Sequence, residues 1–287
     1  MFLGAAAAAR DGPLSAGWLL LTVFGILAIE IAKNASGEIV DLDSGADAAV
    51  SAEDRSPFSG GKRVLVDGLL SRHQTAAVAA VFYALGILAG LAIVIGREQR
   101  VLPLGIAGVA LALFYHAPPV RLSYRGLGEA AVALCYGPLI ACGTYLVQRG
   151  RVSPGILLAS LPLGLLIAAF LWINEFPDYR ADLHAGKRTL VVRLGRSRAA
   201  VAYAALVGAA FLLQAVLALA GSTLSAGTLS GAWIGLLGVV PAFASVRRLL
   251  ATPEDTAKII PAQRLILLAF LLLAAGSGVG FLISAHA

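Results

Sequence analysis

Long apolar runs, separated by shorter segments rich in charge, glycine and proline, dominate the pattern of the chain. A helix needs about 20 apolar residues to cross the hydrocarbon core of a bilayer, and runs near this length recur throughout the sequence. The pattern predicts eight spanning helices, at Ser15–Ala32, Thr75–Ile95, Val101–Tyr115, Leu127–Val147, Pro154–Ile173, Ala199–Ala220, Thr228–Val246 and Leu265–Ala285. Val101–Tyr115 is short for a full crossing, and we expect it to gain length at one end. The predicted fold class is an all-α, polytopic transmembrane helical bundle.

A further apolar segment, Met1–Ala9, precedes the first predicted span. At 1.5 Å per residue it reaches about 14 Å, which is less than half of the ~30 Å hydrocarbon core. It also lacks the basic start of a signal peptide. We interpret it as the tail of a helix whose beginning is missing.

The composition excludes a soluble globular protein. Hydrophobic residues make up 59% of the 287 residues and charged residues 13%, whereas soluble domains carry roughly 25% charged residues. The net charge of +6 does not indicate nucleic-acid binding, because the basic residues lie in loops between the apolar runs. We predict one transmembrane domain over residues 1–287, with cap loops at about 33–74, 116–126 and 174–198.

Basic residues are distributed unequally between the two sets of loops. Most Lys and Arg residues follow the first, third, fifth and seventh spans, and loops rich in Lys and Arg stay in the cytoplasm. We therefore expect an integral protein of a bacterial or archaeal cell membrane, with these loops cytoplasmic. Nearly all acidic residues share that side, and because acids contribute little to topology, their clustering needs another explanation.

The first acidic cluster follows the first predicted span. If that helix continues, Glu30, Asn34, Glu38 and Asp41 recur at spacings of four, four and three and lie on one face. Asp47 follows shortly after. Like charges on one face repel one another, unless a cation lies among them.

The second acidic cluster lies at the cytoplasmic end of the fifth predicted span. Asn174, Asp178 and Asp182 are spaced by four residues, so a helix would place them on one face. Pro177 is expected to disturb the helix, but even a kinked turn keeps the two aspartates adjacent.

Two acidic clusters on separate helices are what a site for Mg²⁺ and a diphosphate requires, because Mg²⁺ is held by one or two carboxylates together with substrate phosphates. The phosphates also need cations, as point charges from Lys or planar forks from Arg. Basic residues of the same cytoplasmic side supply them, with Tyr124 beside them to position the acceptor or the diphosphate. The predicted diphosphate ligands are Lys62, Arg121, Tyr124, Arg125, Lys187 and Arg188.

These motifs resemble those of the UbiA superfamily of intramembrane prenyltransferases. The segment from Asn174 to Gly195 is similar to the second aspartate motif of that family. Residues 124–129, together with residues 44–47 and 57–61, resemble the branch that prenylates 1,4-dihydroxy-2-naphthoate. The resemblance implies a bundle of nine helices around a central cavity. It also implies Mg²⁺-dependent transfer of a polyprenyl group from its diphosphate to an aromatic acceptor, such as a quinone precursor.

The first motif departs from the family, whose motif begins Asn-Asp where this chain has Gly37 and Glu38. Asn34, one turn earlier, is a candidate to supply the missing amide. The resemblance and the spacing together predict these metal ligands: Asn34, Glu38, Asp41, Asp47, Asn174, Asp178 and Asp182. The residues predicted to be catalytic are Asp41, Asp178, Asp182 and Lys187. No residue is indicated as the base that restores aromaticity.

Other functions stay open at this point. The acceptor is alternatively a hydroxybenzoate, homogentisate, chlorophyllide or a lipid glycerol phosphate. A non-enzymatic transporter is the alternative from another class, because an acid inside a span, such as Glu30, often marks an ion pathway. Glu30 could equally pair with Lys33, the other acids lie at one membrane face, and no internal repeat of the transporter kind is visible. Beyond the substrates and membrane lipid, no nucleic-acid or protein partner is predicted.

Overall fold

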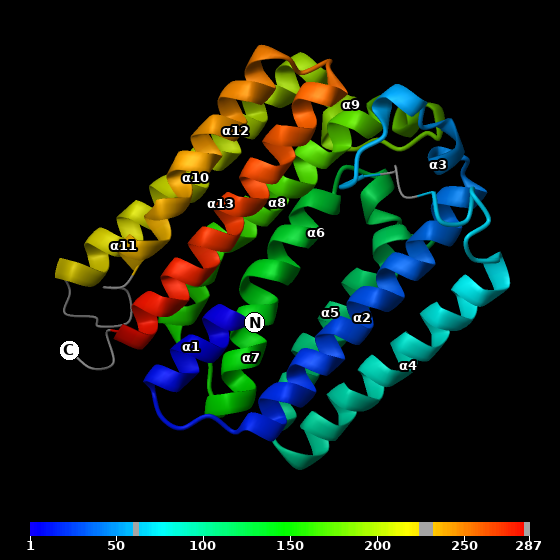
Figure 1. Cartoon of the computed structure of the whole chain (residues 1–287). Coiled ribbons are helices and arrows are strands. Elements are labelled where there is room, and N and C mark those ends of the chain that lie inside the picture. The colour runs from blue at the N-terminus through cyan, green and yellow to red at the C-terminus, as the bar shows by residue number, and fades with distance from the viewer. Residues whose placement is uncertain (60–62, 224–231, 284–287) are drawn as a thin grey trace.

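Long tilted helices packed side by side form the molecule (Figure 1). The computed structural model describes residues 1–59, 63–223 and 232–283, and no strand occurs in those ranges. The α-helices are α1 (Phe2–Arg10), α2 (Ala16–Asp43), α3 (Ala46–Ala49), α4 (Arg72–Gly96), α5 (Leu102–His116), α6 (Gly128–Leu134), α7 (Ile140–Arg149), α8 (Pro154–His184), α9 (Leu190–Leu194), α10 (Arg196–Thr223), α11 (Ala232–Gly235), α12 (Val239–Ala251) and α13 (Thr256–Ile283). The short turns are η1 (Ala52–Asp54), η3 (Gln99–Val101), η4 (Leu122–Tyr124), η5 (Cys135–Leu139) and η6 (Leu236–Gly238). The all-α prediction is confirmed.

Seven helical stretches of the described chain are long and apolar enough to cross a membrane, where the sequence pattern predicts eight. The difference is α5, which has 15 residues and does not lengthen as expected. Pro103 stands in its first turn, and Ala117 is extended because a residue before proline is disfavoured in the helical region. The short helix packs against α2 and α4.

Two helices extend further into the predicted cap than expected. Helix α2 continues to Asp43 and α8 continues through Pro177 to His184, so the beginnings of the predicted loops 33–74 and 174–198 are helical. Gly45 follows α2 with a φ of +76°, a left-handed conformation that glycine adopts without steric cost. Both acidic motifs therefore lie on helices.

The predicted span Leu127–Val147 is interrupted in its middle. It consists of α6, the π-helical turn η5 and α7. Pro138 lies inside this turn, and Gly137 has non-helical dihedral angles. A Cβ at Gly137 would lie 2.8 Å from Gly164 Cα of α8, so the close approach of the two helices requires glycine there.

The terminal segments complete the bundle. Helix α1 buries Leu3, Ala6, Ala7 and Ala8 and packs against α7 and α13, although it is too short to cross. The start of the predicted span Thr228–Val246 and the end of Leu265–Ala285 lie outside the described residues. The described parts of these spans belong to α11–α12 and α13.

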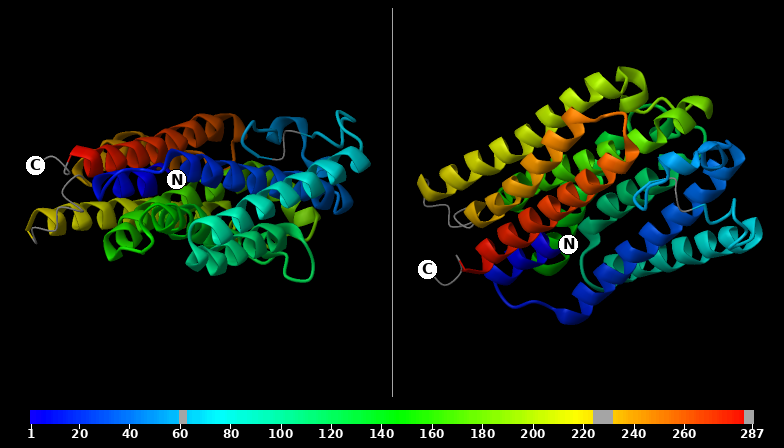
Figure 2. Two further views of the ribbon diagram at one scale, coloured as in Figure 1. Left: turned by 90° about the horizontal axis from the view of Figure 1, so that it is seen from below. Right: turned by 45° about the horizontal axis from the view of Figure 1, so that its top comes forward.

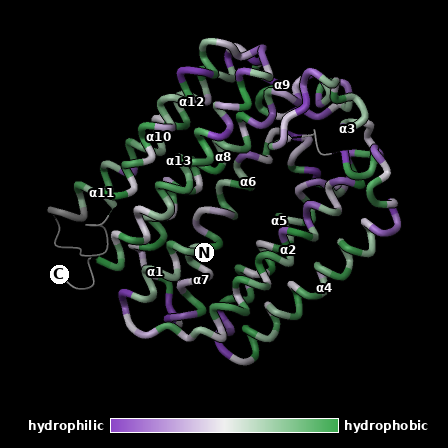
Figure 3. The backbone as a smooth tube through the Cα atoms, in the orientation of Figure 1, coloured by the Kyte–Doolittle hydropathy of each residue, from purple (hydrophilic) through white to green (hydrophobic). Residues whose placement is uncertain are grey.

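One end of the bundle is polar. Hydrophilic backbone gathers around α3 and α9 (Figure 3), where α2 and α8 both end, and in the two views of Figure 2 the blue segment around α3 lies at this end, beside the ends of α2 and α4. Helix α8 runs through the middle of the bundle, in contact with α6, α10 and α13. The fold thus brings the ends of the two acidic helices to one side.

Candidate active site

Carboxylates from the two acidic helices meet at one ammonium group. Lys187 Nζ lies 2.8 Å from Asp41 Oδ1 of α2 and 3.5 Å from Asp182 Oδ1 of α8. The loop after α8 places the lysine there, because Gly186 adopts a φ of +72° and the Lys187 amide donates to the Asp182 carbonyl at 2.8 Å. The side chains of Lys187 and Asp182 are 12% and 8% exposed. A buried cation therefore joins the two motifs.

Tyr124 lies against this cluster. Its hydroxyl donates to Asp41 Oδ1 at 3.2 Å and lies 2.8 Å from Ser44 Oγ. The guanidinium of Arg121 lies 4.1 Å from the centre of the Tyr124 ring. Arg121 adopts a left-handed conformation with a φ of +48°, and its buried Nε has no hydrogen-bond partner among the described residues. A strained arginine with an unused donor beside carboxylates suits an anionic ligand.

The carboxylates are crowded. Burial, together with the charges of Asp41 and Glu38, raises the pKa of Asp47 to about 7, and Lys187 partly offsets this shift. Burial disfavours the charged lysine, but Asp182 and Asp41 overcome that effect and raise the pKa of Lys187 above its ordinary value. The cluster therefore carries more negative charge than the single ammonium compensates.

This charge distribution fits a hard cation. No group of three or more His, Cys, Asp or Glu side chains in the described chain stands in a ready metal-binding arrangement. However, the oxygen donors are of the kind that Mg²⁺ prefers, and the raised pKa of Asp47 indicates that a further positive charge would be stabilising. The carboxylates that act on one another and fit this role are Glu38, Asp41, Asp47 and Asp182.

Gly37, the position where the motif departs from the family, contacts His116 at the end of α5. A Cβ at Gly37 would lie 2.7 Å from His116 Nε2, closer than non-bonded atoms approach. His116 Nδ1 lies 3.5 Å from Ser123 Oγ. The imidazole thus occupies the space in which a side chain at residue 37 would begin.

The other predicted ligands lie around this cluster with different partners. The Asn34 amide donates to Glu30 Oε1 at 3.1 Å, and Asn174 Oδ1 accepts a bond of 3.1 Å from Gln263. Asp178 is half-buried one turn before Asp182. Metal binding by these residues stays a prediction.

The remaining predicted cations are less central. Arg125 donates to the Pro119 carbonyl at 2.9 Å, and the Arg188 side chain is exposed while its amide donates to the Tyr124 carbonyl at 3.0 Å. Lys62 lies outside the described residues. Lys187, Arg121 and Tyr124 are thus the predicted diphosphate ligands that the fold brings to the carboxylates.

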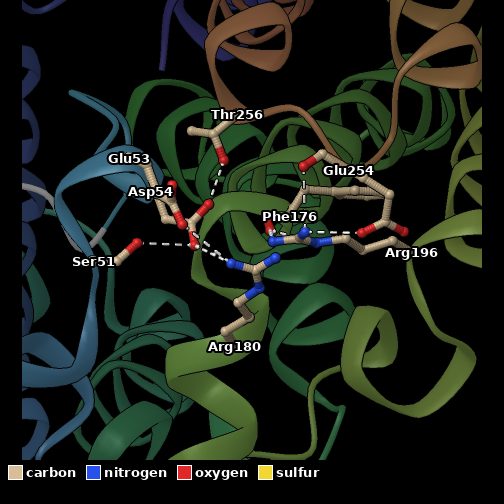
Figure 4. A network of polar contacts seen from close by, with 8 residues as sticks. All are labelled: Ser51, Glu53, Asp54, Phe176, Arg180, Arg196, Glu254 and Thr256. Carbon is tan, nitrogen blue, oxygen red and sulfur yellow. Dashed lines mark hydrogen bonds and ion pairs between the residues drawn. The ribbon is translucent and has the colours of Figure 1, made fainter.

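A polar network fastens the neighbouring segments to α8 (Figure 4). Asp54 of η1 accepts a bond of 2.8 Å from Thr256 of α13 and lies 3.9 Å from Arg180 Nη1. On the other side, the buried Arg196 donates through Nη2 to the Phe176 carbonyl at 2.9 Å and pairs with Glu254 at 2.9 Å. These contacts fix the helix turn that carries Asp178 and Asp182.

An apolar cavity of about 580 Å³ lies within the bundle, between α2, α4, α5 and the α6–α7 segment. Its wall is made mainly of aliphatic residues and glycines, with Glu30, Lys33, Tyr115 and Tyr136 at one end. Lys33 Nζ lies 5.6 Å from the centre of the Tyr115 ring, and Tyr115 precedes His116. The polar end of the cavity therefore lies on the two helices, α2 and α5, whose ends border the carboxylate cluster.

Sequence reasoning missed several of these residues. Ser44 and His116 carry no local pattern that distinguishes them from ordinary loop residues. Tyr136 looks like a packing residue of an apolar run. Glu30 did carry a signal, as an acid inside a span, and its expected pairing with Lys33 is confirmed at 2.9 Å.

Comparisons with known proteins agree with this architecture. A sequence model described as the UbiA prenyltransferase family matches residues 1–273. The chain is similar to 1,4-dihydroxy-2-naphthoate octaprenyltransferase of Bacillus subtilis, with 25% identity over 208 residues that cover 71% of this chain and 63% of that protein. It is also similar to 2-carboxy-1,4-naphthoquinone phytyltransferase of Synechocystis sp., with 31% identity over 180 residues that cover 61% of this chain and 55% of that protein. The chain thus spans less than two thirds of the length of these relatives.

Solved structures share the fold. A UbiA homologue from Aeropyrum pernix K1 in its apo form has a TM-score of 0.68 and 18% identity, covering 98% of this chain and 94% of that one. A UbiA homologue from Archaeoglobus fulgidus, bound to GPP and Mg²⁺, has a TM-score of 0.60 and 17% identity, with 95% of each chain covered. The family match and the seven candidate spans together identify an integral membrane protein.

Proposed function

Because the chain belongs to the UbiA prenyltransferase family, we propose that it transfers a polyprenyl group from polyprenyl diphosphate to an aromatic acceptor within the membrane. The observation that carries this proposal is that one helix, α2, lines an apolar cavity and also carries Asp41 of the charged cluster. A polyprenyl diphosphate has the same division, with an anionic head and an apolar tail. The names of the relatives favour a quinone precursor such as 1,4-dihydroxy-2-naphthoate as the acceptor.

The charged cluster would bind the diphosphate head. Glu38, Asp41, Asp47, Asp178 and Asp182 would hold Mg²⁺. When bound, Mg²⁺ supplies positive charge that stabilises the departing diphosphate. Support for this cofactor comes from the oxygen donor set and from the homologue bound to GPP and Mg²⁺.

The protein's own cations would act on the same charge. Loss of an allylic diphosphate leaves negative charge on the phosphate oxygens, and donors arranged in advance lower that barrier. Lys187 would donate to these oxygens from its position between Asp41 and Asp182. Arg121, with its unused Nε, and the Tyr124 hydroxyl would also bind the head.

The cavity would hold the prenyl tail and the reacting carbon. Its aliphatic lining excludes water that would otherwise capture a carbocation-like carbon. The acceptor ring would attack this carbon as the diphosphate leaves, and the attacked ring carbon would then release the proton, or as carbon dioxide the carboxylate, that it carried. The distribution of Lys and Arg among the loops favours the cytoplasm as the side from which the diphosphate enters.

The test uses the full chain in nanodiscs with Mg²⁺ and labelled geranylgeranyl diphosphate. We would offer 1,4-dihydroxy-2-naphthoate, 4-hydroxybenzoate, homogentisate and glycerol 1-phosphate separately, and measure diphosphate release together with a lipid-soluble adduct. We expect an adduct with a naphthoate, and at least a hundredfold lower rate in Asp182→Asn.

Asp255→Asn is the matched control, because Asp255 pairs with Lys258 at the surface and should turn over normally. An adduct with another acceptor would support the proposed transferase activity but identify that acceptor, and not a naphthoate, as the substrate. Absence of any adduct, together with absence of Mg²⁺-dependent diphosphate binding, would refute the proposed function.

A further inference from the structure

Two loops that carry predicted diphosphate ligands are joined to each other. The loop between α5 and α6 carries Tyr124, and the loop between α8 and α9 carries Lys187. The Arg188 amide donates to the Tyr124 carbonyl at 3.0 Å, and Lys187 Nζ lies 5.3 Å from the centre of the Tyr124 ring. The two loops therefore meet at the residues that would bind the diphosphate.

Gly126 and Arg193 reinforce this contact. A Cβ at Gly126 would lie 2.9 Å from the Arg188 carbonyl oxygen, so the close approach of the loops requires glycine there. Arg193 of α9 donates through Nε to the Arg188 carbonyl at 2.9 Å and through Nη2 to the Arg125 carbonyl at 2.8 Å. One guanidinium thus bridges the two loops.

Glu129, in the first turn of α6, holds the second loop from within the protein. Its Oε1 accepts a hydrogen bond of 3.0 Å from the amide of Leu190, the first residue of α9. Glu129 is only 4% exposed, and burial of a carboxyl group is costly unless the group is hydrogen-bonded. The proposed chemistry assigns no task to this buried acid, whereas its bond to Leu190 does.

We propose that Glu129 and Arg193 are positioning residues that hold Lys187 and Tyr124 in the geometry that binds the diphosphate. Both ligands lie on loops, and a loop that becomes ordered only when a ligand binds lowers the affinity by the free energy of that ordering. Because the two loops are joined in advance, this loss is avoided. The inference rests on the proposed function and adds the residues that prepare its diphosphate site.

The response of Mg²⁺ binding separates positioning from general damage to the site. Asp41 and Asp182 lie on the long helices α2 and α8, whereas Glu129 and Arg193 hold the segment that follows α8. A loosened Lys187 would compete less with Mg²⁺ for these two carboxylates. Loss of the positioning contacts should therefore weaken diphosphate binding without weakening Mg²⁺ binding.

The test uses the full chain in nanodiscs, with inorganic diphosphate as the probe. Titration calorimetry measures the affinity for Mg²⁺ alone and then the affinity for inorganic diphosphate at saturating Mg²⁺. Hydrogen exchange with mass spectrometry measures the order of the peptide that contains Arg188 and Leu190. Glu129→Met removes the acceptor at similar volume and should weaken diphosphate binding about tenfold, with faster exchange of this peptide and no loss of Mg²⁺ affinity.

Two further variants and a control accompany it. Glu129→Gln retains a side-chain carbonyl for the Leu190 amide, so it should keep the diphosphate affinity and the exchange rate of the wild type. Arg193→Met removes only exposed bonds, so it should fold normally and weaken diphosphate binding about threefold. Arg198→Met is the matched control, because Arg198 is exposed on α10 and its loss removes the same charge but none of the bonds named above.

Several outcomes would overturn the positioning role. They are unchanged diphosphate affinity in both Glu129→Met and Arg193→Met, a parallel loss of Mg²⁺ affinity in Glu129→Met, and a loss that Glu129→Gln shares. Absence of diphosphate binding in the wild type would instead count against the proposed function. The exchange measurement would still decide the inference in that case, because an unchanged rate in Glu129→Met would show that Glu129 does not order the loop.

Discussion

Replacing Lys187 with methionine removes the positive charge at the centre of the carboxylate cluster. The ammonium lies 2.8 Å from Asp41 and 3.5 Å from Asp182, and these carboxylates are 18% and 8% exposed. Removing one partner of a buried ion pair costs about 3–5 kcal/mol, because the remaining charge stays uncompensated. Because the Asp41 side chain still reaches some solvent, we expect a loss near the lower limit, about 3 kcal/mol of unfolding free energy.

Magnesium should reverse this loss. A ligand that binds only the folded state at a hundred times its dissociation constant stabilises that state by about 2.7 kcal/mol, which is similar to the expected cost of the substitution. The variant should also bind Mg²⁺ more tightly than the wild type, because the ion no longer competes with an ammonium for the same oxygens. Transfer activity should nevertheless fall, since the leaving diphosphate loses a donor.

The free energy of unfolding is measured in detergent, with tryptophan fluorescence as the signal, in EDTA and at increasing Mg²⁺ concentrations. Isothermal titration calorimetry measures the Mg²⁺ affinity. Lys258→Met is the control, because its pair with Asp255 is exposed on both sides and should change neither quantity. The reasoning would be refuted if Lys187→Met were as stable as the wild type in EDTA and bound Mg²⁺ with unchanged affinity.

Two further predictions concern the same end of the bundle. Gly37→Asn should lower the unfolding temperature, because the Cβ of the new side chain would lie 2.7 Å from His116 Nε2. The additional substitution His116→Ala should restore the unfolding temperature. A double variant that is no more stable than Gly37→Asn would argue against the clash. Because the pKa of Asp47 is raised from its ordinary 3.8 to about 7, its protonated form favours the folded state below pH 3.8, and this contribution is lost as the pH rises to about 7. Mg²⁺ affinity, measured by titration calorimetry, should therefore increase between pH 5.5 and 7.5, and Asp47→Asn should flatten that dependence; an unaltered slope in the variant would exclude Asp47 as its source.

The fold class and both acidic motifs could be predicted from the sequence because their signals are local. The length of an apolar run determines whether a helix can cross a bilayer, and a four-residue spacing places Asn174, Asp178 and Asp182 on one face of a helix. The residues at which the helices end were harder to predict. Helix α5 ends before Pro118 instead of lengthening, whereas α8 continues through Pro177, so the presence of a proline does not by itself specify where a helix ends.

The assembly of the site depended on contacts between distant parts of the chain. Asp41 and Lys187 form an ion pair across about half of the sequence, and His116 fills the space beside Gly37. The pairing of Glu30 with Lys33 is local, but its position on a cavity wall beside Tyr136 arises from the packing of α2 against the α6–α7 segment. Periodicity along one helix specifies which residues share a face. Which residues lie opposite that face depends on how the helices pack, and only the tertiary structure decides that packing.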